Sequence, residues 1–171
     1  MTNTIGQSVP RIDARDKVTG AALYSGDLVR PDMLYMKTLF AGHPHAQVLR
    51  IDTSEALALP GVVAVFTAAD VLVNEYGLQW KDQPVLCGPG LPSPIPGTDM
   101  GGPRGAWTEI VRCEGDLVAA IVAESEAIAA KARDLVQVEY EDLPAVFDAA
   151  AALKPEAPRI HPERGDSNVC V

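Results

Sequence analysis

The chain has 171 residues, 47% hydrophobic and 22% charged, which is typical of one globular domain and excludes a chain that is disordered throughout. Its 14 Lys and Arg against 23 Asp and Glu give a net charge of −9, which disfavours binding to nucleic acid or anionic lipid. The most apolar stretch, Leu59 to Val73, is interrupted by a Pro-Gly pair and by Asp70, so no membrane span is expected. The N-terminus lacks the basic start and apolar run of a secretory signal, which predicts a cytoplasmic protein.

Three regions are predicted along the chain. Residues 1–32 are rich in charges and turn formers and are expected to form an extended arm with a turn at Gly20. Residues 33–155 carry the regular hydrophobic patterns of a folded domain, at whose end Asp148 is expected to cap a short Ala-rich helix. Residues 156–171 show no periodicity and predict an irregular tail.

The first half of the domain predicts three strands and a short helix. Met33 to Phe40 is apolar at both alternating sets of positions, which favours a strand largely buried on both faces. Ala46 to Ile51 predicts a second strand, and Thr53 to Leu59 a two-turn helix that a Pro-Gly pair ends. The β-branched run Val62 to Thr67 predicts an inner strand.

The second half predicts a strand, a helix and a strand. Leu117 to Ala123 is a continuous apolar run typical of a buried strand, and Ser125 stands where it would cap the next helix. That helix has apolar residues on one face at Ile128, Ala132 and Leu135. Val136 to Tyr140 then alternates apolar and polar residues, as a half-buried strand does. Together these form a β-α-β unit.

A segment rich in proline and glycine separates the two halves. Pro84 to Pro103 contains six prolines and five glycines, a density that neither a strand ladder nor a helix sustains. A long loop is therefore predicted, and loops of this length inside compact domains are usually either functional or disordered. Two interpretations stay open: an ordered wall against another polypeptide, or a mobile lid.

The residue patterns assign no catalytic, cofactor-binding or metal-binding residue. His43 and His45 would share one face of a strand, but a metal site needs further ligands, and a structural role is the alternative. Glu141 and Asp142 are adjacent carboxylates next to a turn that ends in proline, and they are interpreted as a solvated strand end rather than an acid–base pair. The cysteines are three in number, far apart and without a CxxC pair, so they form neither a disulfide framework nor a metal or iron–sulfur centre alone: Cys87, Cys113 and Cys170.

Several segments in order resemble the N-terminal α/β-hammerhead domain of the molybdenum-binding subunit of the xanthine dehydrogenase/aldehyde oxidase family. In the first half they are Arg11-Ile12-Asp13, Lys17-Val18-Thr19-Gly20-Ala21 with Tyr24, Met33-Leu34, His45-Ala46 to Ile51-Asp52, Leu59-Pro60-Gly61-Val62 and Thr67-Ala68-Ala69-Asp70-Val71. In the second half they are Val111-Arg112, Gly115-Asp116-Leu117-Val118-Ala119, Val122-Ala123-Glu124 and Val138-Glu139-Tyr140-Glu141-Asp142-Leu143-Pro144. One departure is Gly115-Asp116-Leu117, where the family usually shows Gly-Glu-Pro.

The resemblance implies an α+β fold: a small mixed sheet with two main helices and the long loop at 78–107. It also implies that the catalytic glutamate and the pterin-binding loops belong to polypeptide beyond Asn168 to Val171. Either the molybdenum subunit is encoded in pieces, or the chain is a fragment of it. No activity and no cofactor are expected for this chain alone.

The implied enzyme hydroxylates an aldehyde or an N-heterocycle with oxygen derived from water. Its cofactors are a molybdenum-pterin, [2Fe–2S] clusters and FAD, and the implied partners are a molybdenum-binding subunit or domain, an iron–sulfur subunit and a flavin subunit. This domain would pack beside the first two and shape the funnel to the metal. The candidate funnel wall is Trp80, Leu86, Leu91 and Trp107.

Two other functions stay open for a chain with this fold. It could be a stand-alone module that binds a small ligand, or a scaffold that serves only assembly.

Overall fold

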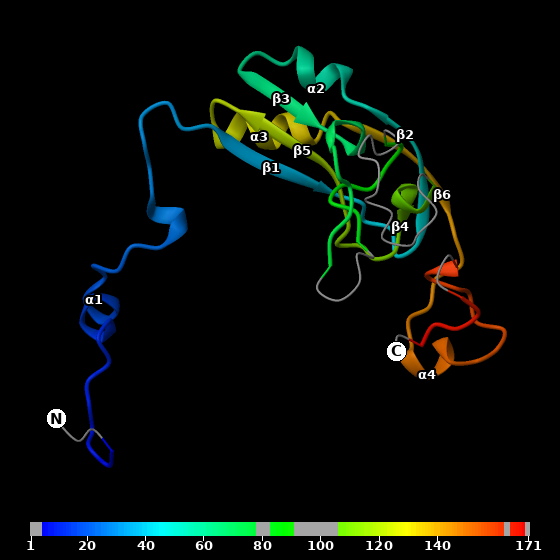
Figure 1. The fold of residues 1–171 in the computed structure, drawn as a ribbon. Coiled ribbons are helices and arrows are strands. Elements are labelled where there is room, and N and C mark those ends of the chain that lie inside the picture. The colour runs from blue at the N-terminus through cyan, green and yellow to red at the C-terminus, as the bar shows by residue number, and fades with distance from the viewer. Residues whose placement is uncertain (1–4, 78–82, 91–105, 163–164, 170–171) are drawn as a thin grey trace. The chain divides into compact units, whose positions relative to one another are not determined.

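The computed structural model describes residues 5–77, 83–90, 106–162 and 165–169 (Figure 1). The chain divides into two units, Met1–Met33 and Leu34–Val171. The strands all belong to the second unit, which also contains the helices α2 to α4. Among the described residues there are also three short 3-10 turns: Ser25–Asp27, Ala68–Asp70 and Ala106–Glu109.

The first unit contains a short helix where an extended arm was predicted. Helix α1 spans Ala14–Thr19 and ends at Gly20, whose φ of 75° is left-handed. Asp13 precedes it and binds Lys17 Nζ at 2.7 Å and Arg11 Nε at 2.6 Å. Lys17, followed by Arg11, holds the pKa of Asp13 below its ordinary value. These local charge pairs favour one helical turn although α1 buries no residue.

Sheet 1 contains three antiparallel strands in the order β1-β5-β3 (Figure 1). Strand β5, Leu117–Ala123, lies in the centre between β1, Tyr35–Phe40, and β3, Val62–Phe66. The prediction of an inner strand at 62–67 is therefore wrong, because β3 forms an edge of this sheet. The prediction that β1 is buried on both faces is also wrong, since Met36 and Phe40 are exposed.

Sheet 2 contains three antiparallel strands in the order β4-β2-β6. These strands are β4, Ile110–Val111, β2, Ala46–Asp52, and β6, Gln137–Asp142. The α+β hammerhead class is confirmed, but its strands are divided between two antiparallel sheets rather than joined in one mixed sheet. The predicted β-α-β succession is present, yet its two strands, β5 and β6, belong to different sheets.

Three helices belong to the second unit: α2, Ser54–Ala58, α3, Glu126–Arg133, and α4, Ala149–Ala152. The predicted caps are confirmed, because Ser125 Oγ accepts the Ile128 N–H at 3.3 Å. Asp148 Oδ1 likewise accepts the Ala151 N–H at 2.7 Å. Helices α2 and α3 pack on the same face of sheet 1, since Ala56 and Ala132 belong to one buried cluster with Ile121.

Two buried clusters form the core of the second unit, and Ile51 and Val138 pack against both. The first is Ala41, Val48, Cys87, Val111 and Val118. The second is Ala56, Ala119, Ile121, Ala132 and Val136. The shared contacts of β2 and β6 link the inner sides of the two sheets.

The cap of α3 provides a first stability test. Changing Ser125 to Ala removes the acceptor of the Ile128 N–H and should lower the free energy of unfolding by about 1 kcal/mol. Ser125→Asp keeps an acceptor at the positive end of the helix and should restore most of it. Urea denaturation of the three chains measures the difference, and an unchanged Ser125→Ala chain would show that the cap contributes nothing.

Among the described residues, no helix combines the length and hydropathy needed to span a lipid bilayer.

Candidate functional site

The described residues include only part of the loop at 78–107, in which the candidate funnel residues were predicted. Trp80 and Leu91 lie outside the described residues. Trp107 is described by its backbone alone, in the 3-10 turn Ala106–Glu109. Leu86 is 5% exposed, so its side chain is buried. The arrangement of the four side chains relative to one another is therefore outside the described part of the chain.

Asn74 holds the backbone of the loop at Leu86. Its Oδ1 accepts the N–H groups of Val85 at 2.8 Å and Leu86 at 3.0 Å, and its Nδ2 donates to the Leu86 carbonyl at 2.7 Å. One side chain thus satisfies three backbone groups that belong to no strand or helix. Asn74 was not predicted from the sequence, because an asparagine 11 or 12 residues from its partners leaves no local pattern.

Backbone bonds close the base of the loop. Tyr76 and Gln83 exchange N–H···O bonds of 2.8 and 3.1 Å. Further along, the Cys87 N–H donates to the Leu117 carbonyl at 2.6 Å, and the Gly88 N–H to the Thr108 carbonyl at 2.9 Å. Residues 88 and 108 therefore lie side by side, and the segment between them begins and ends at the same place beside β5.

Gly88 sits at this base in a conformation that requires glycine. Its φ is 148°, a region that other residues rarely adopt. A Cβ atom at this position would lie 2.7 Å from Ile51 Cδ1, well inside contact distance. Both the backbone and the packing against β2 therefore oppose any side chain here.

Changing Gly88 to Ala should destabilise the chain by about 2 kcal/mol, the typical cost of a strained backbone conformation with a steric contact added. Adding Ile51→Val removes the Cδ1 atom and separates the two causes. If the loss of unfolding free energy in the double variant equals the sum of the losses in the two single variants, the contact with Ile51 contributes nothing and the cost lies in the backbone conformation. Urea denaturation measures the wild type, both single variants and the double variant, and a Gly88→Ala chain as stable as the wild type would contradict the assignment.

Neither described cysteine is suited to be a nucleophile. Burial, together with the Asp116 carboxylate, raises the pKa of Cys87 from its ordinary 9.0 to about 12. Burial and then Asp116 also raise the pKa of Cys113. Both thiols are protonated near neutral pH, whereas the thiolate is the reactive form. The three cysteines of the chain are also fewer than the four ligands that a [2Fe–2S] cluster usually takes.

The two histidines considered as a metal pair have separate partners. His43 Nδ1 lies 2.8 Å from Asp142 Oδ1, and its ring centroid lies 4.2 Å from that of Tyr140. His45 is buried, with Nδ1 2.7 Å from the Pro144 carbonyl. Within the described ranges, no group of three or more His, Cys, Asp or Glu side chains could hold a metal ion. The contacts of the two rings fasten the segment at the start of β2 to the end of β6.

The departure from the family pattern at 115–117 forms a self-contained turn. Asp116 Oδ2 accepts the N–H groups of Arg112 at 2.7 Å and Cys113 at 3.2 Å. The Asp116 N–H donates to the Cys113 carbonyl at 3.1 Å. The aspartate therefore shapes the connection from β4 to β5, and we assign it a structural role.

Asn168 organises the tail of the chain. Its Oδ1 accepts the Ile160 N–H at 3.0 Å, while its Nδ2 donates to the carbonyls of Ala152 at 3.1 Å and Pro158 at 2.9 Å. Arg112 Nε, next to β4, donates to the Ile160 carbonyl at 2.9 Å. The described part of the tail is thus tied to sheet 2 without forming a strand.

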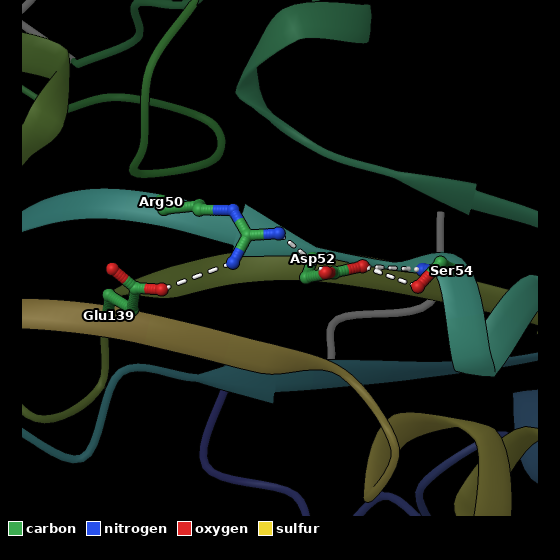
Figure 2. Close-up of polar contacts among 4 residues, drawn as sticks. All are labelled: Arg50, Asp52, Ser54 and Glu139. Atoms are coloured by element: carbon green, nitrogen blue, oxygen red, sulfur yellow. Dashed lines mark hydrogen bonds and ion pairs between the residues drawn. The ribbon is translucent and has the colours of Figure 1, made fainter.

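A charged cluster lies on sheet 2 (Figure 2). Arg50 binds Glu139 on the neighbouring strand at 3.1 Å and Asp52 at 2.7 Å, and Asp52 in turn accepts from the Ser54 hydroxyl at 2.6 Å. Glu139 and Asp52 raise the pKa of Arg50, and Ser54 lowers the pKa of Asp52. The side chains of Arg50 and Glu139 are largely exposed, so these bonds contribute little stability.

This chain is similar in sequence and in fold to known proteins. The family model for the aldehyde oxidase and xanthine dehydrogenase a/b hammerhead domain matches residues 19–89 and 101–144. A probable xanthine dehydrogenase subunit from Bacillus subtilis is 40% identical over 152 residues, covering 88% of this chain. The nicotinate dehydrogenase large molybdopterin subunit of Eubacterium barkeri is 30% identical over 166 residues, 96% of this chain and 34% of its own. Quinoline 2-oxidoreductase from Pseudomonas putida 86 superposes with a TM-score of 0.71 at 36% identity, covering 94% of this chain and 19% of its own.

The chain belongs to the aldehyde oxidase and xanthine dehydrogenase family, in which it corresponds to the hammerhead domain. It spans 18% of the length of the Bacillus subtilis relative. The resemblance read from the sequence is confirmed, and the relatives are named as oxidoreductases or their subunits.

Proposed function

We propose that this chain is the non-catalytic N-terminal part of the large subunit of a molybdenum hydroxylase. The match to the hammerhead family over most of the chain carries the proposal. The substrate class we assign to the whole enzyme is an aldehyde or an N-heterocycle, oxidised with oxygen derived from water. The names of three relatives contain xanthine, nicotinate and quinoline, all of which are N-heterocycles.

In the proposed enzyme, the cofactors are held by other polypeptide. The cysteine content supports this division, because the three cysteines of the chain are too few to ligate one [2Fe–2S] cluster in the usual way. The molybdenum-pterin would supply the oxidation chemistry, with [2Fe–2S] clusters and FAD carrying electrons away. The corresponding partners are a molybdenum-binding part, an iron–sulfur subunit and a flavin subunit, and the proposed location is the cytoplasm.

The loop at 78–107 is the part of the chain that we propose to shape the substrate funnel, with Trp80, Leu86, Leu91 and Trp107 as its wall. Because the Leu86 side chain is buried, its proposed role is to support the wall and not to face the substrate. The support comes from the base of the loop, where Asn74 fixes Leu86 and the Gly88–Thr108 bond closes the two ends. A rigid base is what a wall needs if it is to select substrates by shape.

A chimera tests the proposed function. This chain replaces the matching region of the Bacillus subtilis relative, and the purified chimera is analysed for molybdenum and pterin. We expect both in the chimera and neither in the lone chain. Turnover of a heterocycle by the lone chain, or a chimera that binds no pterin while the unmodified relative does, would contradict the proposal.

The same chimera tests the funnel. Changing Trp80 and Trp107 together to Ala should alter the ratio of kcat/KM for a bulky and a small N-heterocycle by about tenfold, because pocket contacts worth about 1–3 kcal/mol set such ratios. Leu57→Ala, on the exposed side of α2, is the matched control. An unchanged ratio in the double variant would place the funnel elsewhere.

A further inference from the structure

The two faces of sheet 1 differ in what covers them. On the inner face, Ile121 and Ala123 of β5 are fully buried, and Lys37 of β1 pairs with Glu126 at the start of α3. Because side chains alternate along a strand, their neighbours point to the other side. We call that side the outer face of sheet 1; its residues are Met36, Thr38, Phe40, Ala64, Phe66, Ala120 and Val122.

The strand register joins six of these residues into one surface, and Phe40 follows beyond a register shift, where it pairs with Leu117. Met36 and Ala64 both pair with Val122, and the next row is centred on Ala120. Cross-strand neighbours of this kind lie close enough for their side chains to touch. Six of the seven side chains are apolar, one is a threonine, and none is charged.

Within the described residues of the second unit, most of this face is open; the exception is Val118, which lies on the same side of β5 by alternation and is buried in the first cluster. Met36, Phe40 and Phe66 are 61%, 56% and 45% exposed. The helices α2 and α3 pack on the opposite side, where Ala56 and Ala132 meet the inner residues of β5. Two phenylalanines and a methionine on one open sheet face form the kind of patch that marks an interaction surface.

Sheet 2 shows how a solvent-facing sheet surface is built in this chain. Its inner side chains, such as Val48 and Tyr140, join the core, while the outward positions carry Gln47, Arg50 and Glu139. Arg50 binds Glu139 across the strands (Figure 2). Gln47 binds Glu109 of the 3-10 turn Ala106–Glu109. The contrast between two sheets of equal strand number indicates that the outer face of sheet 1 is not a water-facing surface in the assembled protein.

We propose, on the basis of the proposed function, that an apolar and uncharged surface of the remaining large-subunit polypeptide covers the outer face of sheet 1. Two observations favour this occupant. The Bacillus subtilis relative extends far beyond the 18% of its length that this chain matches, so a large amount of polypeptide accompanies the domain there. A second copy of this chain would instead bring together two chains that each carry a net charge of −9.

Oxidation of Met36 tests the coverage directly. Dilute hydrogen peroxide converts an accessible methionine to its sulfoxide, and peptide mass spectrometry gives the rate at this residue. In the lone chain Met36 should react rapidly, because its side chain is open. In the chimera with the Bacillus subtilis relative, the same residue should react at least about tenfold more slowly.

A charged substitution tests the energetic role of the face. Phe66→Lys should reduce the yield of pterin-loaded chimera by about tenfold or more, because it places a charge in an apolar interface. Leu49→Lys is the matched control, since Leu49 is 49% exposed on the bulge of β2 in the other sheet, and it should change the yield less than about twofold. The melting temperature of the lone chain, which we expect to be similar for both variants, confirms that each folds.

The outcomes separate this inference from the proposed function. A pterin-loaded chimera in which Met36 reacts as fast as in the lone chain overturns the inference and leaves the proposed function standing. A chimera without pterin, while the unmodified relative is loaded, overturns both. Protection of Met36 already in the lone chain, whether in a monomer or in a dimer seen by sedimentation, shows that the covering surface lies in this chain and overturns the choice of occupant.

Discussion

Changing Cys87 to Ser is expected to remove a large loss of stability that the wild-type chain undergoes above pH 9. The Cys87 thiol is 1% exposed and packs in the core cluster of Val48, Val111 and Val118. Burial raises its pKa to about 12 from the ordinary 9.0, so the folded chain keeps it protonated where the unfolded chain ionises it. The difference corresponds to about 1.4 kcal/mol for each pH unit between 9 and 12.

The sign follows from proton binding. Above pH 9 the unfolded chain has lost the proton that the folded chain retains, so the stability contributed by the thiol is complete below pH 9 and declines as pH rises toward 12. At pH 10.5 the wild type should have lost about 2 kcal/mol that Cys87→Ser, which has no ionising thiol, does not lose.

Urea denaturation of both chains from pH 7 to 10.5 measures this difference. The Cys87→Ser chain is expected to start about 1 kcal/mol less stable at neutral pH, because a hydroxyl replaces the thiol in the core. Cys113→Ser is the comparison variant: the pKa of the exposed Cys113 is also raised, by burial and then Asp116, but a smaller pH-dependent difference is expected than for the buried Cys87. If the free energies of unfolding of the wild type and Cys87→Ser differ by the same amount at every pH in this range, burial does not raise the pKa of the Cys87 thiol.

Elements defined by local signals were predictable from the sequence. Strand β5 is a continuous apolar run, and the cap at Ser125 depends on a residue three positions away. The alternation that predicted β6 is present as half-buried and exposed neighbours. In each case the deciding interaction is repeated along a few adjacent residues, so the sequence pattern contains it.

The pairing of the strands was not predictable in the same way. Apolar alternation shows that a strand has a buried face but not which strand lies beside it. The β-branched run of β3 fits an edge as well as a centre, and its edge position is set by its pairing with β5, more than 50 residues away. Likewise, β5 and β6 flank α3 but join different sheets, because β6 pairs with β2 instead.

The candidate site illustrates the same limit. The proline and glycine content predicted a long loop, but the groups that fix its base are a side chain at 74 and backbone atoms at 108 and 117. These contacts depend on tertiary structure alone. A reduced, isolated Cys87 was expected from cysteine spacing, whereas its burial in the core of sheet 2 was not visible in the sequence.

Changing Asn74 to Ala is expected to loosen the base of the loop and lower the free energy of unfolding by about 3 kcal/mol. The change removes three hydrogen bonds and leaves the N–H and carbonyl of the buried Leu86 without their side-chain partner. An unmade hydrogen bond at a buried backbone group costs about 1–3 kcal/mol. Amide hydrogen exchange at Val85 and Leu86 should therefore accelerate by at least about a hundredfold, while exchange in β5 should follow only the global loss of stability.

Asn74→Asp separates the acceptor from the donor of this contact. The carboxylate still accepts the N–H groups of Val85 and Leu86, but it cannot donate to the Leu86 carbonyl and places an oxygen against it. We expect the free energy of unfolding of Asn74→Asp to lie between those of the wild type and Asn74→Ala. Amide exchange at Val85 should remain slow in Asn74→Asp. If Asn74→Ala exchanges at these two amides no faster than the wild type, other contacts fix the loop, and the rigid base on which the funnel wall rests would have to come from the backbone bonds at Cys87 and Gly88 alone.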